Sequence, residues 1–280
     1  MRISPLSKTL LAGLMASSAL SAQAGTTLDL STGLSYSSGE YGETASTDVF
    51  VVPLSAKLRT GNWTFKASVP YLRVDGPANA AVVLDDSGGG DGGGGSGRDH
   101  PEDDGEDPIS GAAADRKESG FGDTSLSATY SFDQLGGSST YLDLTGRVRL
   151  PTGDEGKGLG IDTTDYGLSA EFGIDKDAGG AYVMAGRRFL GDADAFARED
   201  GWQAGIGAWR NLGERSSIGI GYDWRESSTG TGQDPAEIYA YLSVKMSDAW
   251  KINLNGSGGI NDASADYSVG VNLTWRAIDR

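Results

Sequence analysis

Apolar and polar residues alternate along many short stretches of this chain. From Trp250 to Asn255, one parity carries Trp, Ile and Leu, and the other carries Lys, Asn and Asn. Side chains of a β-strand point to opposite faces in turn, so each stretch predicts a strand with one apolar and one polar face. About twelve such segments, most of a length that suits a tilted membrane-crossing strand, cover residues 28–36, 50–58, 63–71, 126–132, 142–150, 166–174, 182–190, 202–208, 218–224, 238–246, 250–254 and 267–275.

The connections between these segments alternate between short and long. Short, turn-rich connections lie at 60–62, 175–180, 211–216 and 247–249, and longer ones lie at 37–46, 75–120, 152–162, 191–200 and 226–234. Outer-membrane barrels have short periplasmic turns and longer external loops. In lipid every backbone polar group must be paired, which requires a closed sheet. The sequence therefore predicts an all-β protein with a single antiparallel transmembrane β-barrel of about 12 strands, both of whose ends are periplasmic.

Aromatic residues gather near the ends of the predicted strands. Two girdles at the membrane interfaces are typical of such barrels, and the alternative is the aromatic core of a soluble β-sandwich. Three aromatic residues, Trp209, Tyr239 and Tyr241, have the parity of the polar face, and a β-bulge or a different local register would account for them. The predicted periplasmic girdle contains Trp63, Phe132, Phe172, Trp250 and Trp275, and the external girdle contains Tyr36, Phe50, Tyr71, Tyr166, Trp202, Trp224 and Tyr267.

The first 24 residues have the pattern of a cleavable signal peptide. Arg2 and Lys8 precede an apolar run from Leu10 to Leu20, and an A-x-A site ends at Ala24. This run is too short for a membrane-spanning helix. We therefore expect a signal peptide at 1–24 and a barrel at 25–280, located in the outer membrane of a Gram-negative cell.

Composition excludes several classes of function. The formal net charge of −16 argues against a nucleic-acid partner, and the sequence has no cysteine for disulfides or thiolate chemistry. The single histidine, His100, lies in an acidic, glycine-rich segment rather than in a predicted strand. A catalytic triad needs a held imidazole, and a histidine-based metal site needs more than one. We expect no enzymatic activity, no cofactor and no metal centre.

The polar parity of the strands identifies the residues expected to line the lumen. Arg147 and Arg149 share one face close to the external mouth, where a charged ring would select solutes by sign; acidic neighbours that neutralise them are the alternative. The predicted pore-lining residues are Lys57, Lys66, Asp143, Arg147, Arg149, Asp165, Glu171, Asp223, Arg225 and Lys245, with Asp29, Asp123, Lys251 and Asn253 on the same face.

The segment 75–120 differs from the other connections in length and composition. Residues 88–97 are mostly glycine, and carboxylates surround them. Glycine loses the most entropy on ordering and like charges repel, so we predict a disordered external loop. Two alternatives are a calcium site, although the spacing matches no known repeat, and a looser cation-bridged contact with lipopolysaccharide.

Two stretches resemble a known family. The first is Ser119–Leu126, where Gly-Phe-Gly-Asp opens a strand, and the second is Val148–Asp154, where Leu-Pro-Thr-Gly-Asp ends one and precedes Gly158–Gly160. Together they resemble the outer-membrane family named for the MetA pathway of phenol degradation, which implies a barrel with a transport role. The long acidic loop and the absence of an aromatic residue at Arg280 depart from that pattern.

We therefore expect an outer-membrane barrel that allows passive or facilitated passage of small solutes, and the resemblance alone extends this to hydrophobic or aromatic compounds. The alternative is a non-conducting surface barrel whose acidic loop makes adhesive or lipopolysaccharide contacts, and a secreted soluble β-protein is a third hypothesis. The expected partners are outer-membrane lipid, lipopolysaccharide and a small-molecule solute.

Overall fold

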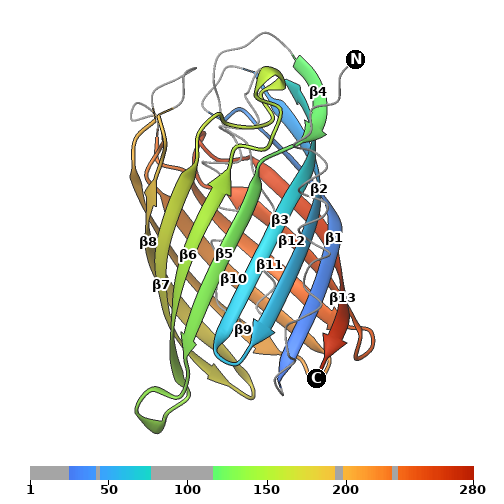
Figure 1. Cartoon of the computed structure of the whole chain (residues 1–280), viewed down its shortest axis with the longest axis vertical. Helices are drawn as coiled ribbons and strands as arrows, with labels where there is room; N and C mark the ends of the chain where they lie inside the picture. Colours follow the sequence, from blue (N-terminus) through green and yellow to red (C-terminus); the bar gives the residue numbers. More distant parts are fainter. Residues whose placement is uncertain (1–24, 42–44, 77–115, 193–197, 229–232) are drawn as a thin grey trace, which may run out of the picture.

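The chain folds into a closed antiparallel β-barrel (Figure 1). The computed structural model describes residues 25–41, 45–76, 116–192, 198–228 and 233–280. Short 3-10 turns lie at η2 (Leu135–Gly137) and η3 (Glu155–Lys157). The strands are β1 (Thr26–Gly39), β2 (Thr47–Thr60), β3 (Trp63–Gly76), β4 (Arg116–Phe121), β5 (Thr124–Phe132), β6 (Thr140–Leu150), β7 (Asp165–Lys176), β8 (Gly179–Phe189), β9 (Gly201–Asn211), β10 (Ser216–Arg225), β11 (Ala236–Lys245), β12 (Trp250–Gly259) and β13 (Tyr267–Asp279).

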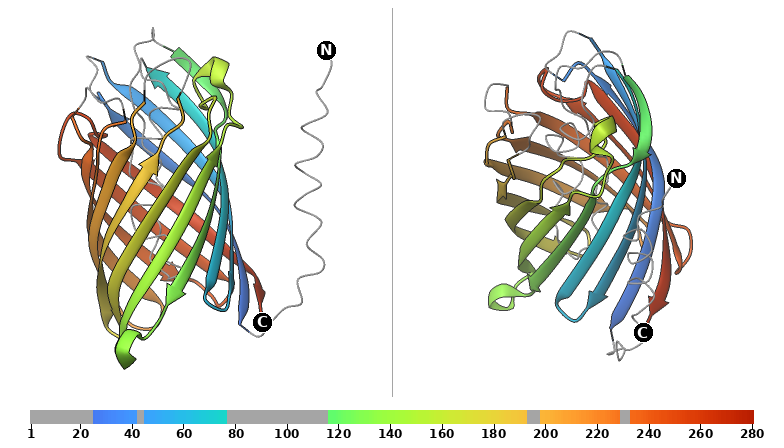
Figure 2. Two further views of the ribbon diagram at one scale, coloured as in Figure 1. Left: turned by 60° about the vertical axis from the view of Figure 1, so that its left-hand side comes forward. Right: turned by 45° about the horizontal axis from the view of Figure 1, so that its top comes forward.

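Strands that are consecutive in the chain pair with each other, except β4 and β5, and β1 pairs with both β2 and β13, so the sheet closes on itself. Both β4 and β5 pair with β3, β4 along its second half and β5 along its first half. They therefore occupy one position in the wall, and the barrel has twelve strand positions. The predicted fold is confirmed. Figure 2 shows the tilt of the strands around the closed wall.

The two ends of the barrel differ. At one end, here called the turn end, β2 and β3 are joined by two residues between the pair Thr60–Trp63, and β7 and β8 by two between Lys176 and Gly179. The last residue lies at this end, where the N–H of Gly25 donates to the carbonyl of Arg280 at 2.6 Å. The longer connections lie at the opposite end, the loop end (Figure 1). The predicted alternation of short and long connections is therefore present.

The barrel is apolar outside and polar inside. Exposed outward side chains form a belt that includes Leu34, Leu54, Leu126, Leu144, Leu168, Ile206, Ile220 and Leu254. Aromatic pairs stand at its edges, among them Trp63 with Tyr130 and Trp250 with Trp275. Buried polar side chains occupy the other parity of the strands. This inverts the pattern of a soluble protein and matches a lipid-facing wall.

Three aromatic residues correct the sequence interpretation. Trp209, Tyr239 and Tyr241 point into the barrel on regular strands, because the pairings of β8 with β9, β9 with β10 and β10 with β11 run without a shift. The proposed bulge or altered register is wrong there. The facing of β8, which the sequence left open, is set by buried Tyr182 and by outward Val183, which is 51 % exposed.

Strand structure extends into both ends of the segment 75–120, since β3 continues to Gly76 and β4 begins at Arg116. Residues 77–115, with His100 and the glycine-acid run, lie outside the described residues, as does the predicted signal peptide at 1–24. In the portion of the chain that is described, no helix has the length and apolar character needed to cross a membrane.

Candidate functional site

The inner wall carries its charges in diagonal rows that follow the cross-strand pairing. One row, called the basic row, consists of Lys57, Lys66, Arg147 and Arg188. Lys57 pairs with Lys66, and Ser127 of β5 lies between Lys66 and Arg147. Gly167 of β7 lies in the same way between Arg147 and Arg188. Because the strands tilt, this row begins near the turn end of β2 and reaches the loop end of β8.

A second row, called the acidic row, consists of Asp143, Glu171, Asp223 and Glu237. Asp143 is opposite Glu171, and Asp223 is opposite Glu237, with Met184 and Gly205 in register between the two pairs. All four carboxylates are buried. The row begins near the turn end of β6 and ends near the loop end of β11, so both rows run the height of the barrel.

Hydroxyl groups separate the two rows. Thr145 lies between Asp143 and Arg147 on β6, and its hydroxyl is 2.8 Å from that of Thr129. Four residues along a strand place the two charged positions about 13 Å apart. The lumen therefore presents a positive edge and a negative edge, with a neutral polar strip between them.

An aromatic layer lies on the turn-end side of the acidic row. We call it the aromatic shelf, and it consists of Tyr141, Tyr182, Trp209, Tyr239 and Tyr241. Each ring lies over an inward glycine of a neighbouring strand: a Cβ at Gly207 would be 2.5 Å from the ring of Tyr182, and one at Gly219 would be 2.3 Å from that of Tyr241. The remaining glycines under the rings are Gly173, Gly180 and Gly221.

Hydrogen bonds fix the shelf against the wall. The hydroxyl of Tyr141 donates to the Glu171 carboxylate at 2.6 Å, which joins the shelf to the acidic row. The hydroxyls of Tyr182 and Tyr239 are hydrogen-bonded to each other. The rings therefore pack closely against the glycines of the wall, and the four tyrosines are at most 8% exposed.

The loop end holds a buried ion cluster made of Asp123, Arg149, Asp165 and Arg198. Arg198 binds Asp165 through both of its terminal nitrogens at 2.8 Å, and Arg149 binds the same carboxylate. Arg149 Nε is also 3.9 Å from Asp123. The positive charge of Arg149 is thus compensated by acidic neighbours, as the alternative interpretation of the sequence expected.

Asp123 is directed inward by a one-residue bulge. Two residues of β3, Val69 and Pro70, lie opposite three residues, Gly122 to Thr124, because the register of β4 and that of β5 differ by one. Such bulges re-aim a side chain. Asp123 accepts hydrogen bonds from the backbone N–H groups of Thr152 (3.1 Å), Gly153 (2.8 Å) and Ile161 (2.9 Å). The two motifs singled out in the sequence are therefore in direct contact.

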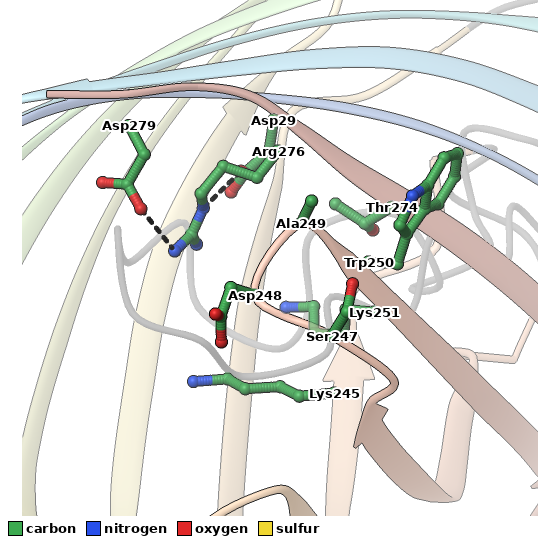
Figure 3. Close-up of a pocket in the computed structure, with 10 residues that line it drawn as sticks. All are labelled: Asp29, Lys245, Ser247, Asp248, Ala249, Trp250, Lys251, Thr274, Arg276 and Asp279. Carbon is green, nitrogen blue, oxygen red and sulfur yellow. Dashed lines mark hydrogen bonds and ion pairs between the residues drawn. The ribbon is translucent and has the colours of Figure 1, made fainter.

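A pocket of about 220 Å³ opens at the turn end, between β1, β11, β12 and β13 (Figure 3). Asp29 lies at its edge and binds Arg276 at 3.0 Å and Arg59 at 2.7 Å. The pocket is lined by the cations Lys245, Lys251 and Arg276 and by the carboxylates Asp29, Asp248 and Asp279. The lining therefore carries three cationic and three acidic side chains.

The structure distributes the predicted lumen residues over four places. Lys57, Lys66 and Arg147 lie in the basic row, and Asp143, Glu171 and Asp223 lie in the acidic row. Arg149 and Asp165 belong to the ion cluster. Arg225 is 3.9 Å from Glu237 at the loop end of the acidic row, and Lys245 lines the turn-end pocket. Their role as pore-lining residues remains a prediction.

Sequence reasoning missed several residues of the inner wall. Arg188 follows the inward parity of β8, which the alternation left undecided. Glu237 is the second residue of β11 and lies just before the predicted segment 238–246. Arg198 lies in a connection, where no periodicity marks it. Within the described ranges, no group of three or more potential metal ligands is placed to hold an ion.

Comparison with known proteins identifies the fold. No family model matches the sequence, and no curated protein matches it. Among solved structures, the COG4313 outer membrane channel from Pseudomonas putida F1 matches with a TM-score of 0.65 at 13% identity, covering 91% of this chain and 97% of that one. The KdgM porin (0.49, 8% identity, 88% and 98%) and the CymD monoaromatic hydrocarbon channel (0.43, 12%, 91% and 88%) are less similar.

This likeness shows the fold of an outer-membrane channel. A closed twelve-position barrel pairs its backbone groups internally, as lipid requires, and its apolar outer belt matches a lipid-facing wall. The chain is an outer-membrane β-barrel, as predicted.

Proposed function

We propose that this barrel passes small solutes through its lumen. The observation that carries the proposal is the pair of oppositely charged rows, each of which runs from the turn end to the loop end. A charged solute that moves along the interior would lie in the electrostatic field of both rows over the whole height of the wall. A barrel that served only as a surface scaffold would not need charge ordered in this way.

We further propose that the solutes carry an aromatic or other planar apolar group. The aromatic shelf places five aromatic side chains on the inner wall, and aromatic rings pack favourably against planar groups. The resemblance of the two sequence motifs to the family linked with phenol degradation supports the same class of solute. The preferred solutes would combine such a group with a polar substituent that the charged rows can hold.

The deciding experiment is single-channel recording of the protein, folded from Gly25 onward, in a planar bilayer. The rows predict opposite changes in ion selectivity. Lys66→Gln and Arg147→Gln should move the reversal potential toward cation preference, and Asp223→Asn should move it toward anion preference. Arg210→Gln is the matched control, because it removes one positive charge from an exposed residue of the outward parity of β9.

A silent bilayer with inserted protein would contradict passage through the lumen and would favour the alternative of a surface barrel acting through its acidic loop. For the solute class, liposome swelling should be faster with an aromatic acid than with an aliphatic acid of the same charge and size. Replacing Tyr241 with leucine should abolish that difference. Equal swelling rates in the parent protein would contradict the aromatic preference.

A further inference from the structure

The inner wall changes character at the loop end of β2 and β3. Toward the turn end, inward positions are polar, as at Lys57 and Lys66. Beyond the directly paired prolines Pro53 and Pro70, the next two inward positions of each strand are apolar. Four of them, Val49, Val51, Leu72 and Val74, are at most 3% exposed. An apolar surface inside a polar lumen must be covered, and the fold supplies the cover from a connecting segment.

The connection between β6 and β7, residues 151–164, reaches this surface at Gly122, where an added Cβ would lie 2.9 Å from Leu72 Cδ1 and 3.3 Å from the carbonyl oxygen of Leu159. We call this connection the lid. Its Leu159 is fully buried and Ile161 is nearly so. Leu159 lies on the inner side of the wall, because a Cβ added at inward Gly120 would be 3.0 Å from its Cδ1. The short turn η3, which lies within the lid, stands beside β4 at the loop end (Figure 1).

Side-chain hydrogen bonds, not a β-ladder, attach the lid to the wall. The three bonds to Asp123 are the central ones. They are joined by a bond from the N–H of Thr124 to the hydroxyl of Thr152 at 2.8 Å and by one from Lys157 Nζ to the carbonyl of Ser119 at 3.4 Å. β4 pairs with β3 alone, so the lid occupies the side of β4 where the next strand would stand. A segment attached in this way can detach without breaking strand pairing.

We propose that residues 151–164 form a movable lid over the loop end of the lumen, and that Asp123 is the latch that holds it in the seated position seen here. The bulge places the latch at the junction of β4 and β5, inside the wall. Arg149 lies 3.9 Å from Asp123 and also binds Asp165, which Arg198 binds in turn, so the latch adjoins the buried ion cluster. The gating role rests on the proposed passage of solutes; the latch itself does not.

The latch is tested by thiol accessibility, because the chain has no cysteine of its own. Leu159→Cys is introduced into the full protein in lipid nanodiscs and treated with a membrane-impermeant maleimide. Loss of the acceptor for three backbone N–H groups should release the lid, so Asp123→Ala should speed labelling by more than about tenfold. Asp123→Asn keeps one carbonyl acceptor and should give an intermediate labelling rate. It is the milder substitution, and it keeps the test usable if the Asp123→Ala variant does not fold.

Glu155→Cys is the matched control, since this exposed lid residue should label rapidly in every background. Equal labelling of the cysteine at 159 with and without Asp123 would overturn the latch. Heat-modified gel mobility confirms that each variant keeps a folded barrel. Because labelling does not require conduction, this result stands even if no solute passes through the lumen.

The gate is tested by a reversible lock. Gly120→Cys with Leu159→Cys places the two thiols at a contact that closes only when the lid is seated. The oxidised protein should lose single-channel openings, and a reductant should restore them in the same bilayer. Openings of equal frequency and size in both states would overturn the lid as a gate. Silence in both states and in the parent protein would contradict the proposed passage, and the gating role with it.

Discussion

The loop end of this barrel and its aromatic shelf organise their interiors in different ways. At the loop end, a connecting segment lies against the wall and is held by Asp123, which belongs to the buried ion cluster. In the shelf, tyrosine and tryptophan rings lie over glycines of neighbouring strands. The first arrangement relies on groups that are distant in sequence and can separate. The second belongs to the strands themselves and persists as long as the sheet does.

The difference separates what can move from what is fixed. The lid is held by a few strong, directional contacts, which fail together when one partner is removed. The shelf is held by close steric fit between several rings and the glycines beneath them. A substitution at one ring should therefore disturb only that ring and its immediate neighbours. Substitutions at the two places should therefore differ both in size and in the region that responds, and four of them test this.

The largest effect is expected at Asp165. Asp165→Asn leaves Arg149 and Arg198 buried without their shared carboxylate, which should cost about 3–5 kcal/mol of unfolding free energy. The measurement is urea-induced unfolding in lipid vesicles, followed by tryptophan fluorescence. Asp154→Asn removes the partner of Lys157 at 3.4 Å, but both side chains are about half exposed, so it should cost less than about 1 kcal/mol. Equal costs would mean that the cluster does not hold the loop end.

Leu159→Ala should come next. Loss of this buried side chain should cost about 2–5 kcal/mol, but the lid should respond rather than the barrel. Hydrogen exchange read by mass spectrometry should accelerate over residues 152–161 and stay unchanged over β8 to β11. Leu135→Ala, at an exposed residue of η2, should alter neither region. Faster exchange in the shelf strands would show that the two regions are not separable.

Gly207→Ala should have a smaller effect, confined to the shelf. Its Cβ would lie 2.5 Å from the ring of Tyr182, so the ring must move at a cost of about 1–3 kcal/mol. Gly146→Ala is the control, because its Cβ would make one ordinary contact at 3.8 Å. Urea unfolding compares the two. A neutral result for Gly207→Ala would mean that the rings are not fitted to their glycines.

The smallest effect is expected for Tyr239→Phe. It removes the hydroxyl bonded to Tyr182, a contact between neutral groups worth about 0.5–1.5 kcal/mol. Tyr222→Phe, on the outward face of the neighbouring strand, should change unfolding by less than about 0.5 kcal/mol. If the two substitutions cost the same, the ring-on-glycine contact alone would hold the shelf.

Much of the wall could be predicted because strand periodicity is strict. A period of two fixed the facing of residues such as Leu144 and Asp143 without any knowledge of their neighbours. The shelf was missed because an inward residue was assumed to be polar. A signal was present: β10 contains Ile-Gly-Ile-Gly at 218–221, with both glycines at inward positions, and each lies opposite a tyrosine of β11.

The lid could be predicted only in part. Pairing of β5 with β6 brings Thr124 opposite Leu150, so the two motifs had to lie close together. Strand parity already placed Asp123 on the lumen face. The sequence could not show that its carboxylate accepts three backbone hydrogen bonds, because that depends on how residues 152–161 fold back against the wall. Arg198 comes from a distant connection without periodicity, and only the folded chain brings it to Asp165.

The extra residue between β4 and β5 also bears on how barrels of this kind can change in length. Because the two registers differ by one, deletion of Asp123 alone would join β4 and β5 into one uninterrupted strand and leave every other side chain on its present face. The hold on the lid is thus a single-codon insertion into an otherwise regular wall. Insertion or deletion of this one residue can create or remove the hold on the lid, and no strand has to change its neighbours or the facing of its side chains.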